Sequence, residues 1–202
     1  GSNNTISSYY GGNNIVGGTN NTISGYPSFS SILGGLHNTS SGGYSIIGGG
    51  FCNVASGFAS IIVGGYVNSA TTNYSFIGGG CFNNIINGLS STIGGGWCNT
   101  TCGNFNFIGG GRKNTSSAYY STISGGQNNE ALASRSYVGG GLCNSVSSSG
   151  AYSTIGGGLF NCVFASQATI AGGNTNLSCS AAGFIGGGVH NQITSCSAYG
   201  VI

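Results

Sequence analysis

The sequence predicts an all-β fold, namely a parallel β-solenoid (β-roll) of about 13 coils with 15–17 residues in each coil and an internal Asn ladder. The main observation is a Ser-x-Ile-Gly-Gly-Gly-x-x-Asn phrase, as in residues 153–161, that recurs along the whole chain. Its last Gly falls at positions 18, 35, 50, 65, 80, 96, 111, 126, 141, 158, 173 and 188. That Gly and the Gly before it occur in all twelve copies, and Ile or Val stands three residues before the last Gly. A short period kept this strictly predicts stacked repeats in place of a globular domain.

The composition agrees with ordered β structure. Gly makes up 43 of 202 residues but does not recur at every third position, and 39% of the residues are apolar, which argues against collagen and against a flexible linker. All four Lys, Arg, Asp and Glu residues lie between positions 112 and 135. A net charge of +2 is too small for a nucleic-acid surface, so no nucleic-acid partner is expected. The same lack of charge removes the repulsion that keeps soluble proteins apart, so we expect self-association.

Residues 1–202 are expected to form a single repeat array that is a fragment of a longer fibre. Gly1 and Asn4 fit the end of an earlier repeat, and Ile202 fits the Ile position of a later one. No segment has the roughly 20 consecutive apolar residues of a membrane helix, so no transmembrane segment is expected.

The four residues before each Gly run, such as 74–77, 105–108 and 152–155, are predicted to form a short strand. Alternation turns the second and fourth residues to the interior and the first and third to the outside. The second is Ser in eight of twelve copies, whereas the outward positions carry bulky residues. The candidate interface consists of Tyr44, Ile46, Ile61, Tyr74, Phe76, Phe107, Tyr120, Tyr137, Tyr152 and Phe184.

The Gly residues are expected to turn the chain, because Gly accepts positive φ and close backbone approach. The Asn three residues later is expected to face inward and to form hydrogen bonds with its equivalents in adjacent coils. This structural ladder comprises Asn21, Asn38, Asn53, Asn68, Asn83, Asn99, Asn114, Asn129, Asn144, Asn161, Asn176 and Asn191. A second segment of small residues, such as 54–57, is expected to form the thinner side of the coil, and the longer steps 18–35 and 141–158 should bulge without breaking the stack.

The phrase at residues 55–65, Ala-Ser-Gly-Phe-Ala-Ser-Ile-Ile-Val-Gly-Gly, resembles the head repeats of YadA-type trimeric autotransporter adhesins and similar arrays in phage and large-virus fibre proteins. The resemblance covers essentially the whole chain. It implies a left-handed β-roll, lateral association of three chains, and a structural or adhesive fibre that is extracellular, on a cell surface or on a virion surface. The neck, coiled-coil stalk and anchor of that family have no counterpart in these residues, so lateral or end-to-end filaments remain alternatives to a homotrimer.

Neither metal nor cofactor binding is predicted. Cys52, Cys98, Cys143 and His190 occupy the same repeat position at intervals of three coils. Three coils correspond to about 14 Å, too far for a disulfide within the chain or for a shared metal ion. Cross-links between chains remain open.

No catalytic set is found, so the protein is not expected to be an enzyme. Glu130 is the only carboxylate side chain, which excludes a pair of carboxylates, and His37 and His190 are about ten coils apart without acidic neighbours. The Gly run before Arg112 and Lys113 lacks the Gly-Lys-Ser/Thr ending of a phosphate-binding loop.

Three functions fit these observations. The preferred one is a structural protein that forms a self-associating fibre for attachment, display or protection. The second is an adhesin head that recognises a host glycan or protein through its exposed aromatic residues. The third, an ice-binding solenoid, requires a regular Thr array, and the third strand position is Thr only at Thr92, Thr122, Thr154 and Thr169.

Overall fold

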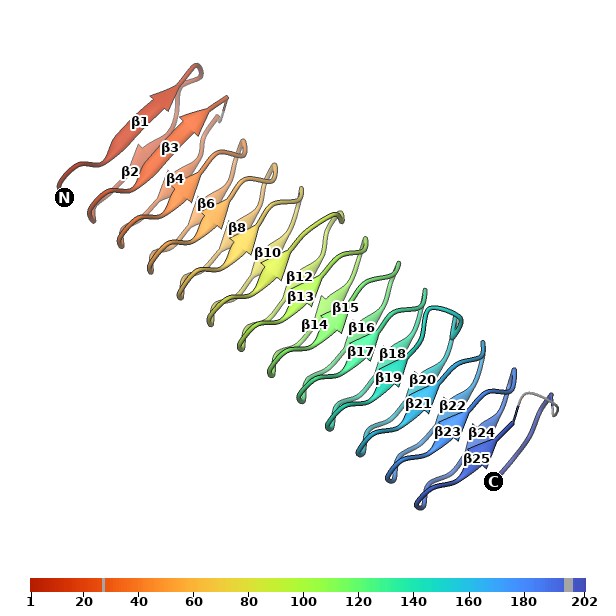
Figure 1. The fold of residues 1–202 in the computed structure, drawn as a ribbon. Helices are drawn as coiled ribbons and strands as arrows, with labels where there is room; N and C mark the ends of the chain where they lie inside the picture. Colours follow the sequence, from red (N-terminus) through yellow and green to blue (C-terminus); the bar gives the residue numbers. More distant parts are fainter. Residues whose placement is uncertain (27, 195–197) are drawn as a thin grey trace. The chain divides into compact units, whose positions relative to one another are not determined.

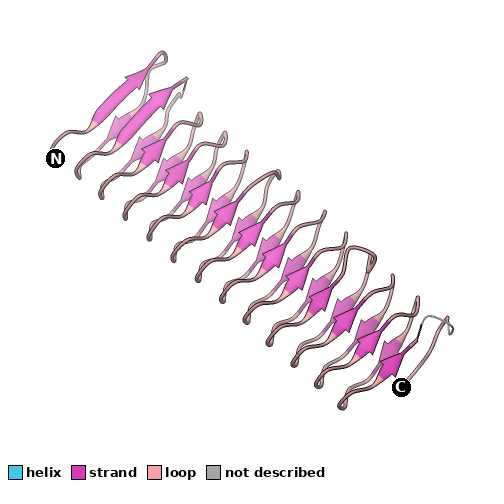
Figure 2. Ribbon diagram, viewed as in Figure 1, coloured by secondary structure: helices cyan, strands magenta, loops and turns pink. Residues whose placement is uncertain are grey.

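The computed structural model describes residues 1–26, 28–194 and 198–202. These residues form β-strands and turns without any helix (Figure 2). The chain is a parallel β-solenoid of about 13 turns, as the repeat predicts. It divides into two compact units, Gly1–Asn99 (unit 1) and Thr100–Ile202 (unit 2), and the same coil recurs within each unit.

Unit 1 contains two parallel sheets, which we call the odd and even sheets after the numbering of their strands (Figure 1). Its odd sheet contains β1 (Thr5–Ser8), β3 (Thr22–Gly25), β5 (Thr39–Ser40), β7 (Val54–Ala55), β9 (Ser69–Ala70) and β11 (Asn84–Ile85). Its even sheet contains β2 (Asn14–Ile15), β4 (Ser31–Ile32), β6 (Ile46–Ile47), β8 (Ile61–Ile62), β10 (Phe76–Ile77) and β12 (Thr92–Ile93). Each coil contributes one strand to each sheet, so the odd sheet is the second side that the small-residue segments predict.

Unit 2 repeats this arrangement. Its odd sheet contains β13 (Thr100–Thr101), β15 (Thr115–Ser116), β17 (Glu130–Ala131), β19 (Ser145–Val146), β21 (Cys162–Val163), β23 (Leu177–Ser178) and β25 (Gln192–Ile193). Its even sheet contains β14 (Phe107–Ile108), β16 (Thr122–Ile123), β18 (Tyr137–Val138), β20 (Thr154–Ile155), β22 (Thr169–Ile170) and β24 (Phe184–Ile185). In the long step to Gly158, Tyr137 still pairs with Thr154 and Ser145 with Cys162, so the inserted residues leave the pairing intact.

The core consists of columns of equivalent side chains. Ile47 pairs in register with Ile62, and Ile62 with Ile77, and all three side chains are fully buried. Burial of each such side chain stabilises the fold by about 1.5–3 kcal/mol. Parallel pairing therefore places each apolar residue against its own equivalents in adjacent coils.

The predicted four-residue strands are wrong in length, because only the third and fourth residues of each set form strand pairs. The first residue adopts left-handed φ, 58° at Tyr74 and 62° at Tyr152, and so belongs to a turn. In some coils the second residue also closes that turn, as where the Ser75 hydroxyl donates to the Thr72 carbonyl oxygen over 2.6 Å. The chain has to change direction within a short coil, and this turn shortens the strand.

The two Gly columns have different structural roles. The last Gly of each run has φ between 82° and 103°, a left-handed conformation that favours Gly. A Cβ on Gly50 would also lie 2.2 Å from the Gly65 carbonyl oxygen of the next coil. The preceding Gly differs: at Gly34 φ is not positive, and an added Cβ would meet no atom within 4 Å. At Gly34, nothing within the described chain therefore requires Gly, whereas φ is between 149° and 159° at the equivalent Gly49, Gly79, Gly140, Gly157 and Gly187.

The structure places the Asn column inside the coil. The side chain of Asn53 is fully buried, and its amide donates to Oδ1 of Asn38 over 3.1 Å and to the carbonyl oxygens of Gly49 and Gly65 over 3.0 Å each. Its own Oδ1 accepts the backbone N–H of Asn68 over 2.9 Å. Each Asn thus connects three successive coils. Most of its partners are backbone groups, whereas the sequence predicts hydrogen bonds between Asn side chains only.

Replacement of a ladder Asn is expected to destabilise unit 2 strongly. In Asn161→Leu the carbonyl oxygens of Gly157 and Gly173 and the N–H of Asn176 lose their buried partner. The free energy of unfolding should fall by about 3 kcal/mol or more, because each unsatisfied buried group costs about 1–3 kcal/mol. The control is Asn174→Leu, whose position is occupied by Leu159 and Val189 in the adjacent coils. Equal melting temperatures for both variants would show that the ladder does not stabilise the fold.

Single Ala substitutions in unit 1 can test the different structural roles of the two Gly columns. Gly35→Ala should destabilise by about 1–3 kcal/mol, because φ is 90° and the new Cβ would lie 2.3 Å from the Gly50 carbonyl oxygen. Gly34→Ala should be neutral or stabilising by up to about 1 kcal/mol, since Ala restricts the unfolded chain. Chemical denaturation of both variants tests this, and a large loss in Gly34→Ala would contradict it.

Candidate interaction surfaces

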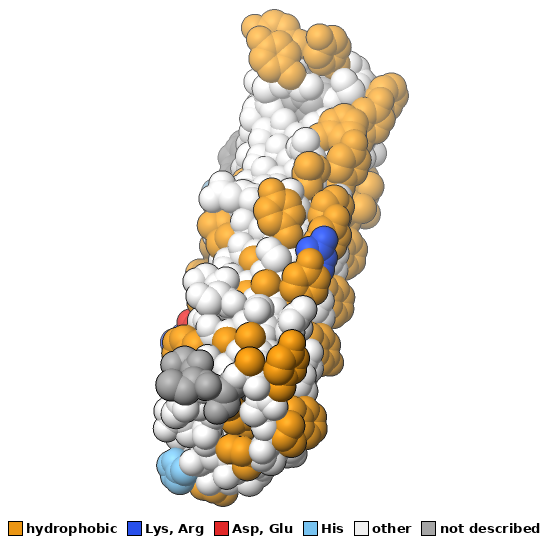
Figure 3. All heavy atoms as spheres, turned by 90° about the vertical axis from the view of Figure 1, so that its right-hand side faces the viewer, with side chains coloured by type: hydrophobic (Ala, Val, Ile, Leu, Met, Phe, Trp, Pro, Cys, Tyr) orange, Lys and Arg blue, Asp and Glu red, His pale blue; other side chains and the backbone are white. Residues whose placement is uncertain are grey.

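The outer face of the even sheet carries one group of the predicted interface residues. In unit 1 these are Ile46, which is 39% exposed, and the half-buried Ile61 and Phe76. Leu33 and Val63 extend the apolar surface of the same sheet and are more than half exposed. In unit 2 the same row contains the exposed Phe107, Tyr137 and Phe184. Figure 3 shows many hydrophobic and few charged side chains on one side of the molecule.

The other predicted interface residues lie in turns and form a separate row. Tyr44 and Tyr74 adopt left-handed φ of 58° and belong to an aromatic stack with Phe29 and Phe58. The ring centroids of Phe29 and Tyr44 are 5.4 Å apart with nearly parallel planes, and Phe58 contacts Tyr44 and Tyr74 edge-on at 5.3 and 5.7 Å. The rings therefore contact one another along the turn row. Phe58 was missed because it lies outside the predicted strand.

In unit 2 the turn row contains a cation between two rings. The Arg135 guanidinium lies 5.5 Å from the Tyr120 ring centroid and 5.1 Å from that of Tyr152. Its Nη1 also donates to the Tyr152 hydroxyl over 2.9 Å. Such contacts at exposed sites contribute about 0.5–1 kcal/mol each, so Arg135 continues the stack in place of an aromatic ring.

A second aromatic stack, which the sequence interpretation missed, lies at the corner after the Gly run. Phe51 and Tyr66 stack with centroids 5.2 Å apart, and Tyr66 meets Phe82 edge-on at 5.3 Å. The sequence does contain a sign of this stack, because Phe51 and Tyr66 occupy the same repeat position, directly after the last Gly.

The described cysteines are free thiols, and Cys196 lies outside the described residues. Burial raises the pKa of the Cys102 thiol. Burial also raises the pKa of the Cys162 thiol, with smaller contributions from the charges of Glu130 and Cys179. A raised pKa lowers the thiolate fraction at neutral pH, so both thiols are expected to be poor nucleophiles.

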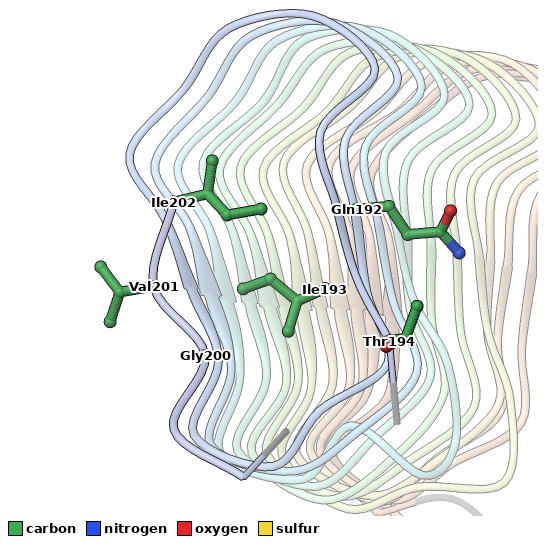
Figure 4. Close-up of a pocket in the computed structure, with 6 residues that line it drawn as sticks. All are labelled: Gln192, Ile193, Thr194, Gly200, Val201 and Ile202. Atoms are coloured by element: carbon green, nitrogen blue, oxygen red, sulfur yellow. The ribbon is translucent and has the colours of Figure 1, made fainter. Parts of the chain in front are cut away.

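The described residues offer no chemical site of the usual kinds. No three His, Cys, Asp or Glu side chains among them are close enough to hold a metal ion. None of the described segments is a helix that could cross a membrane. One hollow lies beside residues 6–9 of the first coil. Another lies at the last coil, where the side chains of Ile193 and Ile202 point into the coil interior (Figure 4). Their lining contains no carboxylate, His, Cys, Lys or Arg side chain.

No protein-family model and no curated protein matches the chain.

The effect of Glu130 on Cys162 can be measured directly. In Glu130→Gln the Cys162 pKa should fall toward its ordinary value, so more thiolate is present at pH 8 and alkylation by iodoacetamide should become faster. The change should be modest, because solvent screens charges at the surface. Mass spectrometry of the labelled peptides gives the rate for each thiol, with Cys52 in unit 1 as the internal control. An unchanged or slower rate at Cys162 would contradict the electrostatic effect.

Proposed function

We propose that this protein is a structural component of a self-associating fibre, located outside the cell or on a virion surface, with a role in attachment, display or protection. The observation that carries the proposal is the exposed apolar row of the even sheet on a chain that has almost no charge. Apolar surface of this kind usually marks an interface, and low net charge leaves little repulsion between copies.

Gly residues that directly follow exposed residues of the even sheet support lateral association between copies. Gly34 follows Leu33 and Gly64 follows Val63, and a side chain at Gly34 would have free space. Gly at such a position permits the backbone of a neighbour to approach closely. A second copy of the chain is the partner we favour, because its surface is equally apolar and uncharged.

Glycan capture is the alternative, and the exposed aromatic turn row is the observation that favours it. A sugar ring packs against the face of an aromatic ring, whereas Phe29 and Tyr44 turn their faces toward each other. Self-association is therefore preferred, and clear hits on a glycan array would favour the adhesin.

Charge placed on the even sheet is expected to disperse the assembly. The double variant Ile46→Lys with Tyr137→Lys adds one cation to the outer face of each unit, at exposed positions that should leave the fold intact. Sedimentation velocity and electron microscopy should show rods or larger species for the native chain and smaller species for the variant. The control is Asn20→Lys, at a corner position where unit 2 already has Lys113. A native chain that stays monomeric in neutral buffer would refute the proposed function.

A further inference from the structure

The first five strands of the odd sheet in unit 1 carry outward hydroxyl groups in two columns, whereas the sixth strand, β11, has Asn84 and Ile86 at these positions. Five successive coils each present two outward residues on this face, the first in the strand and the second two residues later. The pairs are Thr5 and Ser7, Thr22 and Ser24, Thr39 and Ser41, Val54 and Ser56, and Ser69 and Thr71. Nine of these ten positions have a hydroxyl, and the exception, Val54, has nearly the shape of Thr. We call this set the hydroxyl array.

The two columns are held in register by the backbone. Thr22 pairs with Thr39, Thr39 with Val54, and Val54 with Ser69. At the second column, backbone hydrogen bonds between coils continue beyond the short strands. The N–H groups of Ser41 and Ser56 donate to the carbonyl oxygens of Ala55 and Ala70 over 3.0 Å each. The residues between the columns, such as Ile23 and Ala55, are fully buried. The hydroxyl array is therefore a fixed grid, with spacings of about 4.8 Å between coils and about 6.6 Å along each strand.

Most of these hydroxyls are free to bond to an external lattice. Among the described residues, no protein group is hydrogen-bonded to the hydroxyls of Thr22, Ser24, Thr39, Ser41, Ser56 and Ser69. Their side chains are half-buried by one another, which limits their motion. The Thr side chains are also stiff at χ1. Thr71 differs, because its hydroxyl donates to the Ile85 carbonyl oxygen over 2.9 Å.

We propose that the hydroxyl array of unit 1 binds the surface of ice. The grid spacings resemble the repeat distances between water oxygens on faces of hexagonal ice, so many hydroxyls can occupy or anchor lattice positions together. A single hydroxyl gains nothing over liquid water, but many weak contacts on one rigid face add up with little further ordering cost. Liquid water has no lasting lattice, so the same face discriminates ice from liquid.

The charge distribution supports this assignment. Residues 1–99 contain no Lys, Arg, Asp or Glu, so no side chain of these types imposes an ionic hydration shell on unit 1. The matching positions in unit 2 include Glu130, Leu132, Phe164 and Leu177, which interrupt the pattern. The even sheet of unit 1 offers no comparable array of hydroxyl groups, because its outward row contains Ile46, Ile61 and Phe76. The regular array is thus on the odd sheet, whereas the sequence interpretation looked for it on the even sheet.

The test measures inhibition of ice recrystallisation and thermal hysteresis with the full chain. Thr39→Lys places a long charged side chain in the middle of the hydroxyl array. The fold should tolerate it, because the same strand position holds Glu130 and Gln192 in unit 2. The matched control is Ser145→Lys, which adds the same charge at that position on the interrupted face, next to Glu130. We expect Thr39→Lys to need at least about tenfold more protein for equal inhibition, and Ser145→Lys to match the native chain.

Several outcomes would overturn the proposal. One is a native chain without hysteresis or recrystallisation inhibition at high concentration; another is equal loss in Thr39→Lys and Ser145→Lys while circular dichroism shows both folded. Binding to crystalline cellulose or chitin without any effect on ice would assign the array to a polysaccharide. Thr39→Val provides a second variant that keeps the shape and removes one hydroxyl, and partial loss of activity is expected. The even-sheet double variant that disperses the fibre leaves the hydroxyl array intact, so failure of self-association and failure of ice binding can be told apart.

Discussion

In-register parallel stacking is the constraint on which the rest of this structure depends. Every residue lies beside its own equivalents at a distance of about 4.8 Å, so a residue suits the interior only if it packs against or bonds to itself. Ile47, Ile62 and Ile77 meet this condition through apolar contact. Asn53 meets it because an amide can donate and accept at once, toward one coil through Asn38 and toward the other through Asn68. A charged group would face its own charge at the same spacing, which explains why no buried side chain among the described residues is charged.

The sequence was sufficient for the features that recur in every coil. The period, the buried Ile and Ser positions and the number of coils follow from it, because identical neighbours leave few alternatives for residues such as Ile62 and Ser60. The strand length could not be predicted in this way. Tyr74 points outward both in a strand and in a left-handed turn, and alternation alone cannot distinguish the two. The distinction depends on the hydrogen bond from Ser75 to Thr72, which closes the turn.

The two adjacent Gly residues of each repeat also show what the sequence alone cannot predict. In the sequence the two Gly residues form a single signal, whereas the structure separates them by what each would contact. Gly50 is required by its φ and by the carbonyl oxygen of Gly65. Gly34 has neither requirement within the chain. Where φ is not positive and the space is free, as at Gly34, the chain itself gives no reason for Gly, and contact with a second copy is the reason we propose.

The interior and the exterior of each coil can vary independently, since alternate residues along a strand face opposite ways. Unit 1 uses this freedom to make two unlike outer faces, apolar at Ile46 and Ile61 and hydroxylated at Thr22 and Thr39. Each added coil extends both faces by one row, so weak contacts per coil sum to a strong interaction on either face. Association through the apolar face would leave the hydroxylated face free, and would multiply the number of such faces in one rigid object. On these two proposals, one repeat supports two kinds of surface recognition through the number and regularity of its coils.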